Sequence, residues 1–145
     1  MGRSGSERAA GNRTATTIVI HLDTSFAIRA LIRGTTEDKR LRTWLTRGED
    51  VVVSAVAWTE FLCGPLEEAD LVLAVELFGV PSPFRVVEGE LAARLFNESG
   101  RRRGTLIDCM VGAAALAAGA PLATSNPADF RRFAAAGLQV IAAKE

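Results

Sequence analysis

The sequence TTIVIHLDTSFAIRALIRG, residues 16–34, places a short apolar segment directly before an aspartate and a helical pattern. Residues 17–22 are rich in β-branched side chains, which favours a buried strand. Asp23 and the two hydroxyl residues after it are typical helix-capping residues, and the helical pattern that follows ends at Gly34. The stretch therefore predicts a strand-to-helix unit with a carboxylate at the junction.

The same succession of elements recurs along the rest of the chain. A strand is predicted at residues 51–54, and the helix after it passes through Glu60 and ends at a Gly-Pro pair. The pattern of apolar residues predicts three further strands, at residues 84–87, 121–125 and 138–141. It also predicts helices over residues 66–78, 89–99, 105–119 and 127–136. Strands that alternate with helices indicate a parallel sheet in one α/β domain.

The composition is that of an ordinary globular protein. Apolar residues make up 48% and charged residues 23%, and 17 basic residues balance 17 acidic ones, so net charge does not identify a partner. One domain is predicted over residues 17–145, and the polar residues 1–16 are expected to form a disordered leader. No run reaches the ~18 apolar residues of a membrane span, so we expect a cytoplasmic protein with no membrane partner.

Four acidic residues lie just after predicted strands or in the helices beside them: Asp23, Glu60, Asp108 and Asp129. Each also has an ordinary structural explanation. Asp23 is suited to an N-cap, and Glu60 to the polar face of its helix. Asp108 could form a capping box with Thr105, and Asp129 could stabilise the first turn of a helix. The position of any one acid therefore does not indicate a functional site. The position of all four acids at one edge of the sheet does indicate one.

Ligands bind at the carboxyl edge of the strands in open α/β sheets. Several carboxylates that converge there repel one another unless a cation neutralises them. Oxygen ligands without His or Cys select hard ions such as Mg²⁺ or Mn²⁺. The four acids together therefore predict a metal site at this edge. Three polar neighbours are expected to support it, namely Ser25, Thr124 and Asn126.

With these motifs the chain resembles PIN-domain ribonucleases of the VapC toxin type, from about Ile18 to the C-terminus. The motifs that carry the resemblance are LDTSF (22–26), WTEF (58–61), LIDCMVGAAAL (106–116) and LATSNPADF (122–130). The resemblance implies a PIN-like three-layer α/β/α fold. It implies a central parallel sheet of five strands in the order 3-2-1-4-5.

The resemblance also implies a metal-dependent endoribonuclease. Its substrate would be structured RNA of the tRNA or rRNA class, cut to leave 5′-phosphate and 3′-hydroxyl ends. Asp23, Glu60 and Asp108 would hold a first ion, and Asp129 would complete a second site or orient the nucleophile. Asn126 could instead fill the fourth acidic position, and we expect Asp129 to fill it with Asn126 assisting.

Two kinds of protein partner are implied as well. A toxin of this type implies a small antitoxin of the VapB type, which would cover the acidic cleft. The apolar positions of residues 66–80 exceed what one face of a surface helix needs, which favours a homodimer.

Arginines are candidates for binding RNA phosphates at the rim of the site, because the motifs themselves contain no cation. They are Arg101, Arg102, Arg103, Arg131 and Arg132. Two other interpretations stay open. One is a catalytically inactive PIN fold that serves as a binding module. The other is a phosphorelay receiver-like domain, although a receiver should have paired acids after its first strand and a lysine that ends its last strands. Here Lys144 lies past the final predicted strand.

Overall fold

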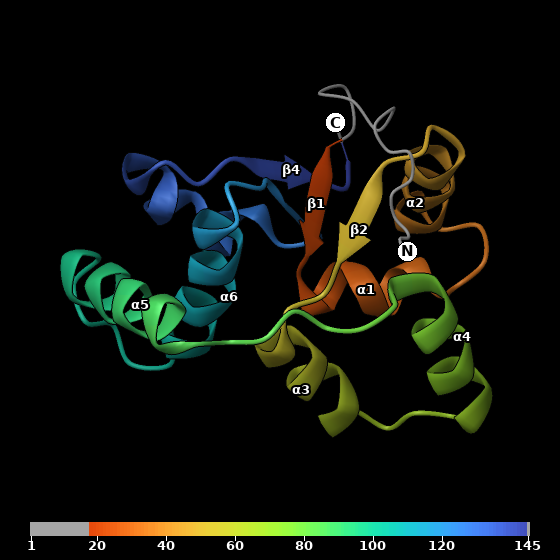
Figure 1. The fold of residues 1–145 in the computed structure, drawn as a ribbon, viewed down its shortest axis with the longest axis horizontal. Helices are drawn as coiled ribbons and strands as arrows, with labels where there is room; N and C mark the ends of the chain where they lie inside the picture. The colour runs from red at the N-terminus through yellow and green to blue at the C-terminus, as the bar shows by residue number, and fades with distance from the viewer. Residues whose placement is uncertain (1–17, 145) are drawn as a thin grey trace, which may run out of the picture.

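The computed structural model describes residues 18–144 of the chain (Figure 1). The leader predicted over residues 1–16 lies outside these described residues.

Four parallel strands form one sheet, which confirms the predicted α/β class. The strands are β1 (Val19–Leu22), β2 (Asp50–Val52), β3 (Leu122–Thr124) and β4 (Val140–Ala142), in the order β2-β1-β3-β4. β1 lies between β2 and β3, with Ile20 opposite Val51 and Leu22 opposite Ala123. Because all strands run the same way, β1 and β3 end at the same edge of the sheet.

The prediction of a five-stranded sheet was wrong at its third strand. Residues 84–87 do not pair with β2, and helix α5 (Val86–Glu98) begins within them. A single bridge remains beside β2, where the Ser82 amide donates to the Val53 carbonyl at 2.9 Å. Pro81 and Pro83 flank Ser82, and a proline has no N–H to donate to a ladder. The predicted order therefore holds for the four strands that form, without the third.

Helices surround the sheet. They are α1 (Thr24–Ala30), α2 (Thr36–Thr46), α3 (Ala55–Cys63), α4 (Glu68–Phe78), α5 and α6 (Leu106–Ala117). α1 packs on α2, α5 packs on α6, and α3 contacts both α1 and α6. In Figure 1 the α5–α6 pair lies on the opposite side of β1 and β2 from α2 and α4. The helix predicted over residues 127–136 is present as two 3₁₀ segments, η2 (Pro127–Asp129) and η3 (Arg131–Ala136).

The sequence analysis did not predict helix α2. Its N-cap is Thr35, whose hydroxyl accepts a hydrogen bond from the Asp38 amide at 3.0 Å. The same hydroxyl donates to the carbonyls of Arg29 and Ile32. Thr35 and Asp38 have the spacing of a capping box, so a helix start could have been read there.

Aromatic rings fill the core on both sides of the sheet. Phe26 of α1 stacks on Trp44 of α2 with ring centroids 5.5 Å apart. Gly112 lets α6 approach η3, because a Cβ at Gly112 would lie 3.3 Å from the Phe133 ring. His21 is buried in β1, and burial lowers its pKa. None of the helices between residues 18 and 144 has the length and apolar character to cross a bilayer.

We expect Thr35→Ala to destabilise the protein by about 1 kcal/mol, because it removes the N-cap of α2. This loss should lower the melting temperature by roughly 2–4 °C for a chain of this size. Thermal unfolding followed by circular dichroism would measure it. Thr46→Ala is the control, since Thr46 lies exposed at the last position of the same helix. An equal loss in both variants would show that the cap does not stabilise α2.

Candidate functional site

Asp23 lies at the junction of β1 and α1, where it is only 7% exposed. Its side chain is the N-cap of α1, with Oδ1 accepting from the Thr24 amide at 2.8 Å. Oδ2 accepts from two hydroxyls, those of Ser25 and Thr124, each at 2.8 Å. The capping explanation of Asp23 is therefore correct, and it leaves a second oxygen that ties α1 to the end of β3.

The end of β3 is connected to the same network. Thr124 is fully buried, and its hydroxyl accepts from the Asn126 amide at 2.9 Å. The Ser125 amide donates to the Ser25 hydroxyl at 3.2 Å. Ser25 and Thr124 therefore hold the Asp23 carboxylate and the loop after β3 together, and their supporting role in a metal site stays a prediction. The Asn126 side chain is exposed at this loop, and its assisting role stays a prediction.

Glu60 reaches the site from α3. Its Oε1 accepts a hydrogen bond from the Thr24 hydroxyl at 2.8 Å, and that hydroxyl also lies 3.2 Å from the Ala57 carbonyl. Although Glu60 is exposed, its carboxylate is thus directed toward the start of α1. From the sequence, Thr24 was considered only as a helix-capping residue. Its place beside Asp23 in the LDTSF motif could have indicated a role in the site.

Asp108 lies in the first turn of α6 and is half-buried. Burial, and after it the charges of Asp129, Asp23 and Glu60, raise the pKa of its carboxyl to about 6, while the charge of Arg132 lowers it. The predicted acids are thus close enough to act on one another. The capping-box alternative for Asp108 is not supported, because the Thr105 hydroxyl makes no cap bond and donates to the Arg102 carbonyl.

The Asp23 carboxyl also has a raised pKa. Burial is the main cause, and the charge of Asp129 adds to it. The hydrogen bonds from Thr124, Ser25 and Thr24 oppose this rise, because they stabilise the ionised form. Asp23 is therefore held in place and remains sensitive to added positive charge.

Arg132 brings a cation to this group of acids. It was predicted to lie at the rim, but its Nη2 lies 3.7 Å from Asp108 Oδ2 and its guanidinium lies over the Phe133 ring at 4.7 Å. Its Nε and Nη2 are buried and have no hydrogen-bond partner among the described residues. The other predicted arginines are exposed: Arg101, Arg102, Arg103 and Arg131.

The donor set of these acids suits a hard divalent cation, since it consists of carboxylate oxygens and hydroxyls. Arg132 lowers the pKa of Asp108, and burial together with the charges of the other acids still raises it to about 6. Within residues 18–144, no three carboxylate, imidazole or thiol groups lie close enough to hold one ion as they stand. Binding an ion would therefore require the exposed side chains of Glu60 or Asp129 to turn inward.

Comparisons with known proteins agree with this fold. The chain matches the model of the PIN domain family over residues 20–136. Among solved structures, VapBC2 from Rickettsia felis bound to a promoter DNA fragment has a TM-score of 0.68 and 16% identity, over 86% of this chain and 98% of that one. VapBC-1 from nontypeable Haemophilus influenzae has a TM-score of 0.66 and 19% identity, over 88% of this chain and 100% of that one.

A third similar structure is VapBC-5 from Mycobacterium tuberculosis, a member of the VapBC family of toxin-antitoxin systems. It has a TM-score of 0.53 and 22% identity, over 86% of this chain and 98% of that one. A search of the curated proteins found no match. The solved structures show a shared fold, and the family model spans all four acids of the site. The chain therefore belongs to the PIN domain family.

Proposed function

We propose that the protein is a Mg²⁺- or Mn²⁺-dependent endoribonuclease and the toxin of a VapBC-type toxin–antitoxin system. PIN domains are generally nucleases. The observation that carries the proposal is the group of four acids at one sheet edge, where burial and the charges of the other three acids raise the pKa of Asp108 to about 6. Its substrate would be structured RNA of the tRNA or rRNA class. The match to the PIN family does not agree with a phosphorelay receiver.

Asp23, Glu60 and Asp108 would hold a first metal ion, and Asp129 with Asn126 would serve a second. Such an ion lowers the pKa of water and stabilises charge on a phosphodiester. The chain itself fixes the positions of its carboxylates. The Ser25 and Thr124 hydroxyls orient Asp23, and the Thr24 hydroxyl orients Glu60.

Arg132 is the best placed of the predicted RNA-binding arginines. Its Nε and Nη2 atoms have no hydrogen-bond partner in the described structure, and charged donors of this kind bind phosphate oxygens strongly. The exposed Arg101, Arg102, Arg103 and Arg131 would contribute at the rim. Arg132 would thus stabilise Asp108 in the free protein and bind the substrate phosphate during cleavage.

An antitoxin of the VapB type and a second copy of the chain are the proposed protein partners in the cytoplasm. The apolar side chains Val72 and Val75 of α4 are half-exposed, and Val80 beyond it is 90% exposed. A pocket of about 430 Å³ between α1, α2 and α4 is lined largely by apolar residues. These surfaces are suited to a two-fold contact or to an apolar helix of the antitoxin, which would also cover the acids.

Replacing Asp108 with asparagine should abolish RNA cleavage. It removes one carboxylate at nearly constant shape, so the metal-free variant should be as stable as the parent or more stable. Mg²⁺ should raise the melting temperature of the parent by mass action, and that of the variant less. Gel assays of RNA cleavage and thermal unfolding with and without Mg²⁺ would measure both effects.

Glu98→Gln is a matched control, because it removes one exposed carboxylate from the end of α5. It should leave the response to Mg²⁺ unchanged. If Asp108→Asn cut RNA at the parental rate, Asp108 would have no part in catalysis. If the parent cut no RNA, the inactive binding module would become the better interpretation.

The stability difference between Asp108→Asn and the parent should depend on pH. The folded-state pKa of Asp108 is about 6, above the value of about 4 expected in the unfolded chain. Between these values the folded parent binds more protons than the unfolded chain, so its stability falls as pH rises. Denaturation in EDTA should therefore show an advantage of the variant that grows through this window and then levels off. A constant difference would mean that the pKa is not raised.

Arg132→Gln should raise the pKa of Asp108 further, because the charge of Arg132 now lowers it. It should also slow RNA cleavage by roughly 10²-fold if Arg132 binds the reacting phosphate. Carbon NMR titration of the carboxyl groups and single-turnover cleavage would test the two effects separately. A normal rate with a shifted pKa would limit Arg132 to a structural role.

A further inference from the structure

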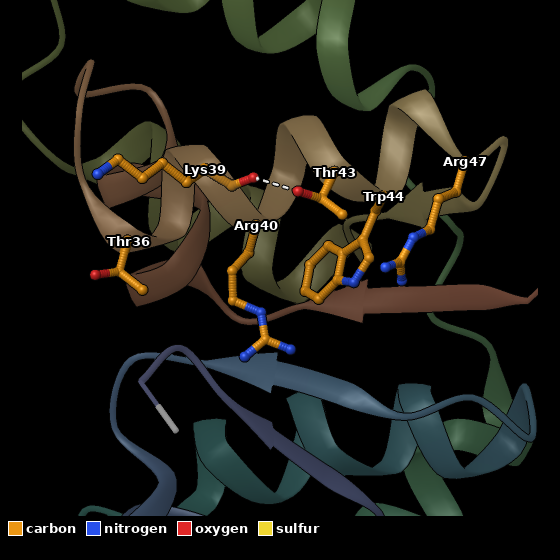
Figure 2. Close-up of a pocket in the computed structure, with 6 residues that line it drawn as sticks. All are labelled: Thr36, Lys39, Arg40, Thr43, Trp44 and Arg47. Atoms are coloured by element: carbon orange, nitrogen blue, oxygen red, sulfur yellow. Dashed lines mark hydrogen bonds between the residues drawn. The ribbon is translucent and has the colours of Figure 1, made fainter.

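One face of α2 forms a basic pocket of about 310 Å³ (Figure 2). Its lining residues are Thr36, Lys39, Arg40, Thr43, Trp44 and Arg47, and none of them is acidic. Figure 2 shows Arg40, Trp44 and Arg47 projecting from the same side of the helix. None of these residues was a candidate in the sequence analysis.

A second pocket, of about 490 Å³, lies where β3 and β4 end. Arg29 and Lys144 supply its positive charge, and Glu37 is its one acidic residue among those that line it. The charge of Glu37 is already engaged, since its Oε2 lies 3.2 Å from Arg29 Nε and accepts from the Ser125 hydroxyl at 2.6 Å. The charge of Arg29 thus mainly neutralises that of Glu37. The charge of Lys144 then makes the net charge of the pocket positive.

The two pockets adjoin each other, and the second reaches the loop after β3. Arg40 lines the first, and its Nη1 donates at 3.0 Å to the Ala142 carbonyl, which belongs to the second. The second pocket includes Ser125 and Asn126, which directly follow the Thr124 that bonds to Asp23. The two pockets are therefore connected at Ala142, and the second lies next to the residue that bonds to Asp23.

Lys39 and Arg47 are the exposed cations of the α2 pocket. Within residues 18–144, neither side chain makes an ion pair or hydrogen bond through its charged group. Arg47 follows Lys39 by eight positions along the helix, which places the two residues about 12 Å apart along its axis. They can therefore contact different phosphates of one strand.

Trp44 does not offer a face for base stacking. It is only 6% exposed, because its ring packs between Phe26 at 5.5 Å and the Arg40 guanidinium at 5.4 Å. Single-strand binding sites that read bases use exposed aromatic rings, whereas backbone binding needs only a positive groove. The chemistry of this groove therefore matches phosphates and not particular bases.

We infer that the α2 groove binds the sugar–phosphate backbone of the RNA segment next to the cleaved bond, through Lys39 and Arg47. The inference rests on the proposed ribonuclease function and locates where its substrate lies. Carboxylates repel a polyanion, so a nuclease built around four of them needs positive charge close by. The α2 groove supplies that charge without entering the acidic site.

The test uses the full chain with Asp108→Asn, which binds RNA without cutting it. The further substitutions Lys39→Gln and Arg47→Gln should weaken binding of a labelled single-stranded RNA roughly tenfold at low salt, with the slope of log Kd against log salt smaller by about 1.4. Fluorescence anisotropy in EDTA over a series of KCl concentrations gives both quantities. Unchanged circular dichroism would confirm that the variant is folded.

The control carries Arg33→Gln and Arg94→Gln, which remove the same charge from exposed positions outside both pockets. Its salt slope should stay at the parental value. If the α2 variant and the control behave alike while the parent chain cuts RNA, the groove inference is wrong and the proposed function stands. A parent that neither binds nor cuts RNA overturns both. A loss confined to self-association or to binding of an acidic protein also overturns the inference.

Discussion

Two hydroxyl groups that donate to one buried carboxylate oxygen hold this structure together at its functional edge. Ser25 belongs to α1, Thr124 ends β3, and both bond to Asp23 Oδ2 at 2.8 Å. A buried carboxylate without partners would be very costly, and these bonds offset much of that cost. They also fix the first helix and the third strand to the same atom. The same hydrogen bonds therefore determine both the position of Asp23 and the packing of α1 against β3.

The same arrangement leaves negative charge that the protein itself does not balance. Burial and the charges of Asp129, Asp23 and Glu60 raise the pKa of Asp108 to about 6, although Arg132 lies 3.7 Å away. A stacked guanidinium at that distance offsets part of the repulsion and makes no hydrogen bond to the carboxylate. A site of this kind reduces the stability of the free protein and increases its affinity for cations. Function and stability thus oppose each other at this edge.

The sequence predicted the parts of the fold in which local pattern and burial agree. Apolar β1 and the nearly uncharged α6 were found, and so was the edge where the acids meet. It missed α2, whose sequence TEDKRLRTWLT is mostly polar, because only Leu41 and Trp44 of its apolar residues enter the core. The third strand was wrong because two prolines leave a single bridge there. Arg132 approaches Asp108 from η3, which is a 3₁₀ helix, whereas the sequence had suggested an ordinary helix.

Net charge did not indicate a binding partner, because acidic and basic residues are equal in number but lie in different parts of the structure. The 17 acidic and 17 basic residues cancel in the sum. In the structure the acids interact where β1 and β3 end, and the exposed cations Lys39 and Arg47 lie along the pocket of α2. Screening confines each field to about 10 Å at ordinary salt, so a polyanion near this surface responds to the local arrangement. Under the proposed function, a chain without net charge would hold a divalent cation at one point and a phosphate backbone at another, which is what a metal-dependent nuclease requires.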